Sequence, residues 1–243
     1  MLEIYTRGES DRGIVLLTGR GELIIAHASA GARSRRRFGG ALQPGARVRA
    51  RWTLPREGAA PRLDEATLMH EPPAPDPLER YYAAAHLLEL GRSLAREGAE
   101  DPRLFRLLCA SLERLDAGDA IDPLLRYVEA WVLALSGLLP EWESCTICES
   151  SLRGVCRYLA LDAGVFCAAH RPAGALSVRS PSADWLRVIR SAPPDAVPAL
   201  PAGSAQELAD LLAALIVHFL ERPLKALPAL AQLRSRRGIG ESA

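Results

Sequence analysis

The spacing of hydrophobic residues changes near residue 72. Before that point, short runs rich in β-branched residues are separated by Gly and Asp, a pattern that predicts strands joined by turns. Five short strands within about seventy residues suit a small antiparallel β-barrel. The expected strands are Leu2–Thr6, Gly13–Thr18, Glu22–His27, Arg47–Thr53 and Arg62–Met69.

A proline-rich segment, residues 71–77, follows this region and indicates a linker. Beyond it, hydrophobic residues recur every three to four positions, which predicts amphipathic helices. We expect Asp76 to cap the first helix, with Pro77 at its first helical position. Later helices are expected at Ser182–Arg190 and after Ser204, and the polar residues 234–243 are expected to be frayed.

The predicted fold class is therefore α+β and multidomain. Residues 1–72 should form an N-terminal barrel, and residues 77–243 an α-helical domain with a cysteine-rich insert at residues 141–172. No apolar run reaches the length of a transmembrane helix, and the first residues lack the layout of a signal peptide. We infer a protein of the reducing cytoplasm with no membrane partner.

The insert contains two pairs of metal-ligand residues, Cys145-x-x-Cys148 and Cys167-x-x-His170, separated by 18 residues. Such paired spacing is typical of a tetrahedral zinc site, and four protein ligands make that site structural, with no open position for catalysis. Cys156 could replace His170 and give a four-thiolate shell. Another reading is two buried cysteine pairs without a metal. A disulfide is disfavoured because nothing marks the chain as secreted, and Cys109 fits a hydrophobic core position.

Positive charge is concentrated in the first part of the chain. Residues 1–56 contain eleven arginines against four acidic residues, whereas residues 57–140 contain eight basic against fifteen acidic residues. The strict alternation of Arg47–Thr53 places its arginines on one face and Trp52 on the other. A basic surface suited to phosphates is predicted, although a solvated charge run is the simpler alternative. Its candidate DNA-binding residues are Arg33, Arg35, Arg36, Arg37, Arg47, Arg49 and Arg51.

Motifs for common enzyme classes are missing from the sequence. Lys225, the one lysine, is not preceded by a glycine-rich loop, which excludes a P-loop. The zincin, α/β-hydrolase and dinucleotide-binding signatures are also absent. We therefore expect a protein that is not an enzyme.

Four motifs, in order, resemble the bacterial RecO family of recombination mediators. The resemblance covers nearly the whole chain, and it is the ordered combination that is specific. The motifs are Gly8-Glu9-Ser10-Asp11-Arg12, the basic loop from Gly31 to Leu42 that ends in Phe38-Gly39-Gly40, the run from Trp131 to Pro140 before the first cysteine, and Arg222-Pro223-Leu224-Lys225.

Membership of that family would imply an OB-fold, a central helical domain and a zinc-finger-like insert. It would also imply binding to single- and double-stranded DNA, annealing of complementary strands, and partnership with RecR in loading recombinase onto SSB-coated DNA. Binding of the SSB C-terminal tail to the helical region and a nucleoid-associated cytoplasmic location belong to the same expectation. Family members with an intact site often end it in C-x-x-C, whereas this chain has Cys167-x-x-His170.

Aromatic residues are scarce before the linker, where only Tyr5, Phe38 and Trp52 occur. Because sequence-tolerant OB-folds often stack bases on aromatic rings, we expect this chain to rely mainly on phosphate contacts, with steep salt dependence. Two other readings remain: a protein-interaction adaptor whose helical domain binds acidic tails without DNA, and a metal-dependent hydrolase, which a fully ligated zinc argues against.

Overall fold

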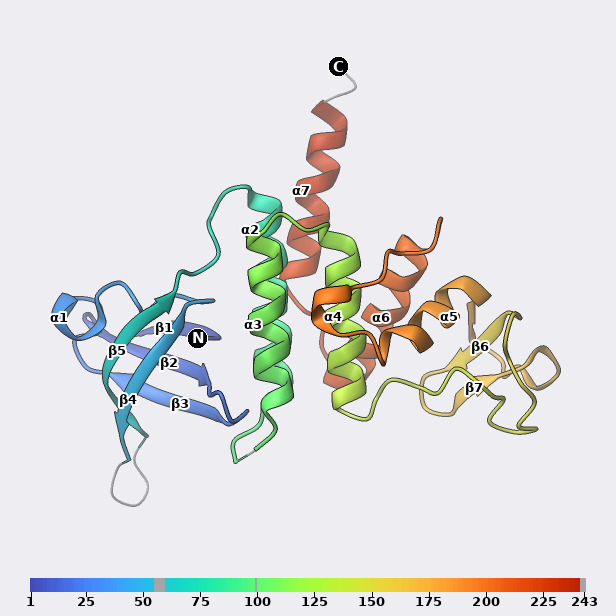
Figure 1. Ribbon diagram of the computed structural model, residues 1–243, viewed down its shortest axis with the longest axis horizontal. Coiled ribbons are helices and arrows are strands. Elements are labelled where there is room, and N and C mark those ends of the chain that lie inside the picture. The colour runs from blue at the N-terminus through green and yellow to red at the C-terminus, as the bar shows by residue number, and fades with distance from the viewer. Residues whose placement is uncertain (55–59, 99, 241–243) are drawn as a thin grey trace. The chain divides into compact units, whose positions relative to one another are not determined.

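A computed structural model describes residues 1–54, 60–98 and 100–240, the last five through their backbone only. The chain divides into two compact units, Met1–Asp119 with Leu224–Ala243, and Ala120–Pro223. The predicted domain division, into residues 1–72 and 77–243, stays a prediction, because these two compact units do not test it. The elements agree with the expected α+β class, because strands dominate the start of the chain and helices dominate the rest (Figure 1).

The first unit contains a five-stranded sheet with hydrogen-bonded order β1-β2-β3-β5-β4. Neighbouring strands are antiparallel, apart from a single parallel pairing of β3 with β5 at His27 and Arg62. All five strands lie within about two residues of their predicted positions. Differences of this size are expected, because element boundaries are the least certain part of a pattern-based prediction. Their bounds are β1 (Glu3–Arg7), β2 (Asp11–Leu17), β3 (Leu23–Ala28), β4 (Arg47–Thr53) and β5 (Arg62–His70).

The predicted closed barrel is wrong for the described residues, because no ladder joins β1 to β4. Two backbone hydrogen bonds come close to closing it: Met1 N donates to Ala46 O, and Gly45 N donates to Met1 O, each at 2.8 Å. The chain turns at this point through Pro44, which has no N–H to donate, and through Gly45 at φ +85°. The extended conformation that a closing ladder needs is therefore interrupted.

One face of the sheet carries the core of this unit. Ile14, Leu16, Ile24 and Leu63 are buried there, and Val48, Ala50 and Trp52 pack against them. Exposure alternates along β4, with the arginines exposed and the apolar residues half-buried. The predicted alternation of β4 is confirmed, because a pleated strand sends successive side chains to opposite faces.

Besides the short α1 (Arg35–Phe38), the described part of the first unit contains the helices α2 (Leu78–Leu94), α3 (Pro102–Asp116) and α7 (Ala226–Gly240). Asp76 does not cap α2, since Pro77 at ψ 143° is still extended and occupies the cap position itself. Residues 234–240, which were expected to be frayed, belong to α7, and α7 packs against α2; residues 241–243 lie outside the description. Glu89 of α2 accepts hydrogen bonds from the backbone N–H groups of Lys225 and Ala226 at 2.9–3.0 Å, which stabilises the start of α7.

The second unit contains helices and a small sheet. Helices α5 (Ser180–Ile189) and α6 (Ala205–Leu220) pack on α4 (Ile121–Leu135), as their apolar stripes predict. Ser204 occupies the cap position of α6 but makes no side-chain cap bond. The insert forms an unpredicted three-stranded sheet of order β7-β6-β8. Its strands are β6 (Arg157–Ala160), β7 (Gly164–Phe166) and β8 (Leu176–Val178), and 3-10 turns span Ala168–His170 and Pro194–Ala196.

Candidate nucleic-acid face and metal cluster

The basic loop between β3 and β4 is anchored by one aromatic residue. It contains the short helix α1 (Arg35–Phe38), and Phe38 is only 2% exposed because it enters the core of the sheet. Gly39 at φ +44° and Gly40 at φ +86° then turn the chain, and both values favour glycine. Arg33, Arg35 and Arg36 are exposed, and within the described ranges no acidic side chain forms an ion pair with them. Their positive charge is therefore open to solvent.

Arg37 differs from its neighbours because the protein fixes its position. Its Nε donates to Ser34 Oγ at 3.0 Å, and its Nη2 donates to the backbone oxygen of Ser29. Its guanidinium also lies 4.9 Å from the centre of the Phe38 ring, a cation–π distance. One arginine of the loop is thus oriented in advance, and the three others are exposed at the surface.

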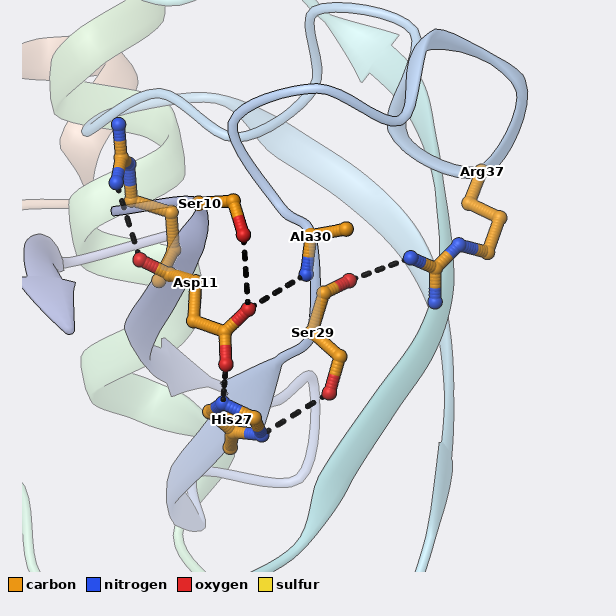
Figure 2. A network of polar contacts seen from close by, with 7 residues as sticks. Ser10, Asp11, His27, Ser29, Ala30 and Arg37 are labelled. Carbon is orange, nitrogen blue, oxygen red and sulfur yellow. Dashed lines mark hydrogen bonds and ion pairs between the residues drawn. The ribbon is translucent and has the colours of Figure 1, made fainter. Parts of the chain in front are cut away.

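Asp11 holds the start of this loop in place. Its Oδ1 accepts the backbone N–H of Ala30 at 2.8 Å, and its Oδ2 lies 3.0 Å from His27 Nε2 (Figure 2). The Ala30 hydrogen bond, followed by the bond to His27, lowers the pKa of Asp11 below its usual value. Ala30 itself adopts φ +51°, a strained conformation for alanine, which this contact stabilises. The Asp of the Gly8–Arg12 motif therefore shapes the loop that carries the arginines.

The structure separates the three arginines of β4. Arg47 pairs with Glu113 of α3 at 2.6 Å, and Arg51 pairs with Glu65 of β5 at 3.0 Å while remaining 75% exposed. Arg49 is exposed and has no ion-pair partner in the described part of the chain. Arg49 and Arg51 are thus exposed, whereas Arg47 is engaged by the helix, and a continuous basic face stays a prediction.

An open pocket of about 650 Å³ joins the loop to the sheet. It brings together the predicted Arg37 and Arg51 with two residues that sequence reasoning missed, Arg62 and Asp64. Its lining residues are Ser29, Arg37, Arg51, Trp52, Thr53, Arg62 and Asp64. Trp52 packs on the core, as the alternation of β4 predicts, and it is also among the residues that line this pocket.

In the second unit, the structure brings the four predicted metal ligands together. The Sγ atoms of Cys145, Cys148 and Cys167 and a ring nitrogen of His170 all lie within 4.8 Å of one another. Cys148 Sγ is 3.9 Å from Cys167 Sγ, and His170 Nδ1 is 3.9 Å from Cys145 Sγ and 3.2 Å from Cys167 Sγ. Cys156 lies apart from this Cys3His cluster, with its Sγ 3.2 Å from Ser177 Oγ. The geometry therefore selects His170 over Cys156.

Two turns present these ligands. In the first, Glu149 N donates to Cys145 O at 2.9 Å and Cys145 N donates to Ser150 O at 3.0 Å. In the second, Cys167 follows β7 and His170 ends the 3-10 turn. Thr146 N donates to Val165 O at 2.9 Å, which ties the two turns together. Backbone hydrogen bonds of the two turns thus help to position the four side chains.

The donor set fits a zinc ion. Metal–ligand bonds of about 2.3 Å to sulfur and 2.0 Å to nitrogen in a tetrahedron place the ligand atoms roughly 3.5–3.8 Å apart. The three distances above, from 3.2 to 3.9 Å, lie on either side of that range. Backbone N–H groups, first that of Cys148, lower the pKa of the Cys145 thiol to about 6, which favours the thiolate that binds metal. Burial raises the pKa of Cys167, so its thiol gains most from a cation.

A buried arginine connects the cluster segment to the helices. Arg157 of β6 is fully buried, and its guanidinium donates to Trp142 O at 2.8 Å, Val155 O at 3.3 Å and Asp184 of α5 at 2.7 Å. Burial alone would raise the pKa of Asp184, but hydrogen bonds from Ser180 and Arg157 outweigh it and lower the pKa. His218 of α6 also pairs with Asp162 at 2.8 Å. The predicted role of the insert in holding helices together agrees with these contacts.

The fold and the two sites define a class: a protein that combines a curled, arginine-rich five-stranded sheet with helices and a small Cys3His module. Comparison with known proteins identifies the family. The family profile described as "Recombination protein O C terminal" matches residues 76–228. The chain belongs to the RecO family, as its motifs predict. In the described residues, no helix is both long and apolar enough to cross a lipid bilayer.

Several relatives carry the name "DNA repair protein RecO". The protein of Myxococcus xanthus is 34% identical over 227 residues, which cover 93% of this chain and 92% of the relative. The protein of Desulforudis audaxviator is 34% identical over 232 residues, covering 93% and 91%. That of Anaeromyxobacter sp. strain K is 33% identical over 241 residues with the same coverage. The similarity therefore spans both units.

Proposed function

We propose that this chain is a non-catalytic DNA-binding protein of recombinational repair. The observation that carries the proposal is the set of exposed arginines at residues 33, 35, 36 and 49, which no acidic side chain neutralises within the described ranges. Such a surface binds the phosphate backbone by releasing counterions. The names of the relatives, all DNA repair proteins, support the same assignment.

An OB-type sheet is part of this proposal. The strand order β1-β2-β3-β5-β4, with α1 in the connection between β3 and β4, suits a partly open Greek-key barrel of that kind. On such a scaffold, phosphate contacts give affinity for single- and double-stranded DNA with little sequence preference. Neutralising the phosphates of two strands lowers their mutual repulsion, so complementary bases can pair. Strand annealing would then need no catalytic residue.

Zinc is proposed as the ion of the Cys3His cluster. Cys145, Cys148, Cys167 and His170 would hold it, and a bound zinc would supply a structural crosslink between the two turns. Because all four positions are protein side chains, the cluster offers no water for hydrolysis. The ion pair of Arg157 and Asp184 would help to position the segment that carries the cluster.

Partnership with RecR and with the C-terminal tail of SSB, leading to recombinase loading in the nucleoid, is proposed from family membership. Membership supports the pathway and does not assign contact residues. Co-purification with RecR and calorimetry with an acidic SSB tail peptide test these partnerships. Failure of both would leave a DNA-binding protein without the mediator role.

The central test is oligonucleotide binding and annealing by the full-length protein at several salt concentrations. Changing Arg33, Arg35 and Arg36 together to Gln should flatten the log–log salt slope for single strands by about two units, at about 0.7 per phosphate contact. Annealing should fall in parallel with binding. A matched control changes Arg20, Arg96 and Arg106, which are equally exposed in the same unit, and should retain the slope.

A folded loop variant with an unchanged salt slope and full annealing would contradict the assignment of this surface. If the wild-type protein binds neither single- nor double-stranded DNA but binds acidic peptides, the adaptor reading replaces the proposal.

A further inference from the structure

The four residues of the Cys3His cluster differ in their access to solvent. Cys145 is only 1% exposed, and Cys167 and His170 are half-buried, whereas Cys148 is exposed. A cysteine that binds metal does so as a thiolate. The oxidation of a cysteine depends on its thiolate character and its exposure. Cys148 combines both properties, so it is the sulfur of the cluster that a small oxidant meets first.

A second sulfur lies close enough to react with Cys148. The Sγ atoms of Cys148 and Cys167 are 3.9 Å apart. A disulfide needs a separation of about 2.05 Å, which side-chain rotation and a small movement of the two exposed turns provide. Cys148 belongs to the first turn and Cys167 to the start of the second, so a bond between them would join the same two segments that the metal joins.

We propose that Cys148 and Cys167 form a redox switch, in which a peroxide oxidises the pair to a disulfide and the cluster loses its metal. The inference goes beyond the proposed function and rests on its zinc assignment. The Cys148 thiolate attacks one oxygen of hydrogen peroxide, the O–O bond breaks, and hydroxide leaves, which makes Cys148 a sulfenic acid. The Cys167 thiolate then attacks the Cys148 sulfur, and the S–O bond breaks as a second hydroxide leaves. Two protons from solvent convert both hydroxides to water.

The disulfide removes half of the ligand set. Its two sulfurs are no longer thiolates, which are the form of cysteine that binds metal. Cys145 and His170 remain, and two protein ligands fall short of the four that a structural zinc site requires. The two turns stay joined through the new bond, so the ligand residues are kept near one another. A thiol reductant can therefore restore both thiolates and the site, which makes the change reversible.

The experiment treats the full-length protein, purified without chelator, with hydrogen peroxide. A coloured chelator reports released zinc, a thiol reagent counts the free cysteines, and mass spectrometry of unreduced peptides maps the disulfide. We expect one metal ion to be released for each disulfide formed, and the disulfide to link Cys148 with Cys167. Addition of a thiol reductant together with zinc should restore both thiols and the bound metal.

Cys156→Ser is the matched control, because Cys156 belongs to the same unit and lies apart from the cluster. This variant should release metal at the wild-type rate. Cys148→His keeps four protein ligands and removes the exposed sulfur, so peroxide should release its metal about tenfold more slowly or less readily still. If Cys148→His does not hold metal, the disulfide map and the release stoichiometry of the wild-type protein decide the question.

Retention of zinc by the peroxide-treated wild-type protein would overturn the switch but leave the zinc assignment standing. A disulfide between Cys145 and Cys148, a release that reductant and zinc do not reverse, or release from Cys148→His at the wild-type rate would overturn it as well. A protein that contains no zinc before treatment would overturn the zinc assignment and the inference together.

Discussion

Replacing Arg157 tests how the second unit holds its metal segment. The guanidinium is fully buried and donates to two backbone oxygens and to Asp184, whose side chain is 35% exposed. Arg157→Met keeps most of the volume but leaves the oxygens of Trp142 and Val155 without their donor. Breaking a buried ion pair costs about 3–5 kcal/mol. Because water reaches Asp184, we expect the lower end, about 3 kcal/mol, for Arg157→Met.

Asp184→Asn tests the ion pair with Arg157 by a milder substitution. It retains a hydrogen-bond acceptor for Arg157 and loses the charge, so a loss of about 1.5–2 kcal/mol is expected, the contribution typical of a hydrogen bond to a charged group. Arg171→Met is the control, since the Arg171 guanidinium lies over the Tyr158 ring 4.7 Å from its centre at the surface. An exposed substitution of this type changes stability by about 0.5 kcal/mol or less.

The assay is urea unfolding of the full-length protein, followed by the fluorescence of Trp142 and Trp185, both buried in the second unit. Metal release to a chelator is measured in parallel, because Arg157 links the residues before Cys145 to α5. Faster release from Arg157→Met than from Arg171→Met would support the link. Equal stability and equal release rates in the two variants would refute the reasoning that Arg157 anchors the segment.

Three further predictions concern pH, metal and helix capping. The lowered pKa of Asp184 contributes stability that is present above the ordinary value of 3.8 and lost as pH falls through the lower folded value; Asp184→Asn should abolish this component of acid unfolding. Elemental analysis should find one zinc per chain, lost in Cys145→Ser and His170→Ala and kept in Cys156→Ser, and retention in His170→Ala would contradict the assigned ligands. Glu89→Ala should destabilise α7 by about 1 kcal/mol, seen as faster amide exchange after residue 225, and unchanged exchange there would contradict this role of Glu89.

The sequence predicts those parts of the fold that local spacing controls. The five strands, the alternation of β4 and the meeting of the two ligand pairs all follow from residues close together in the chain. The alternation Tyr158-Leu159-Ala160 and Gly164-Val165-Phe166 around Asp162 and Ala163 would also have predicted the β6–β7 hairpin. The cysteine spacing does not indicate this hairpin, because it suggests a metal site whatever the conformation of the backbone between the cysteines.

Features that depend on contacts between residues far apart in the chain could not be predicted from the sequence. The polar α7 has no strong pattern of its own and depends on Glu89, more than 130 residues earlier. Arg62 and Asp64 line the pocket with Arg37 and Arg51 because β5 pairs with β4 and α1 packs on β5. Arginine is normally a surface residue, and the burial of Arg157 is explained only by the carbonyls and the carboxylate around it. In each case, the deciding partner is far away in the chain.

The return of α7 to the first unit has a consequence for the order in which the protein assembles. The second unit, residues 120–223, is an insertion between two parts of the first, and the helix capped by Glu89 is made only after that insertion. During synthesis the whole second unit can fold while α2 still lacks its partner helix. Removing residues 224–243 should therefore expose the apolar face of α2 and weaken the sheet-bearing unit, although the deleted residues adjoin the other unit in sequence.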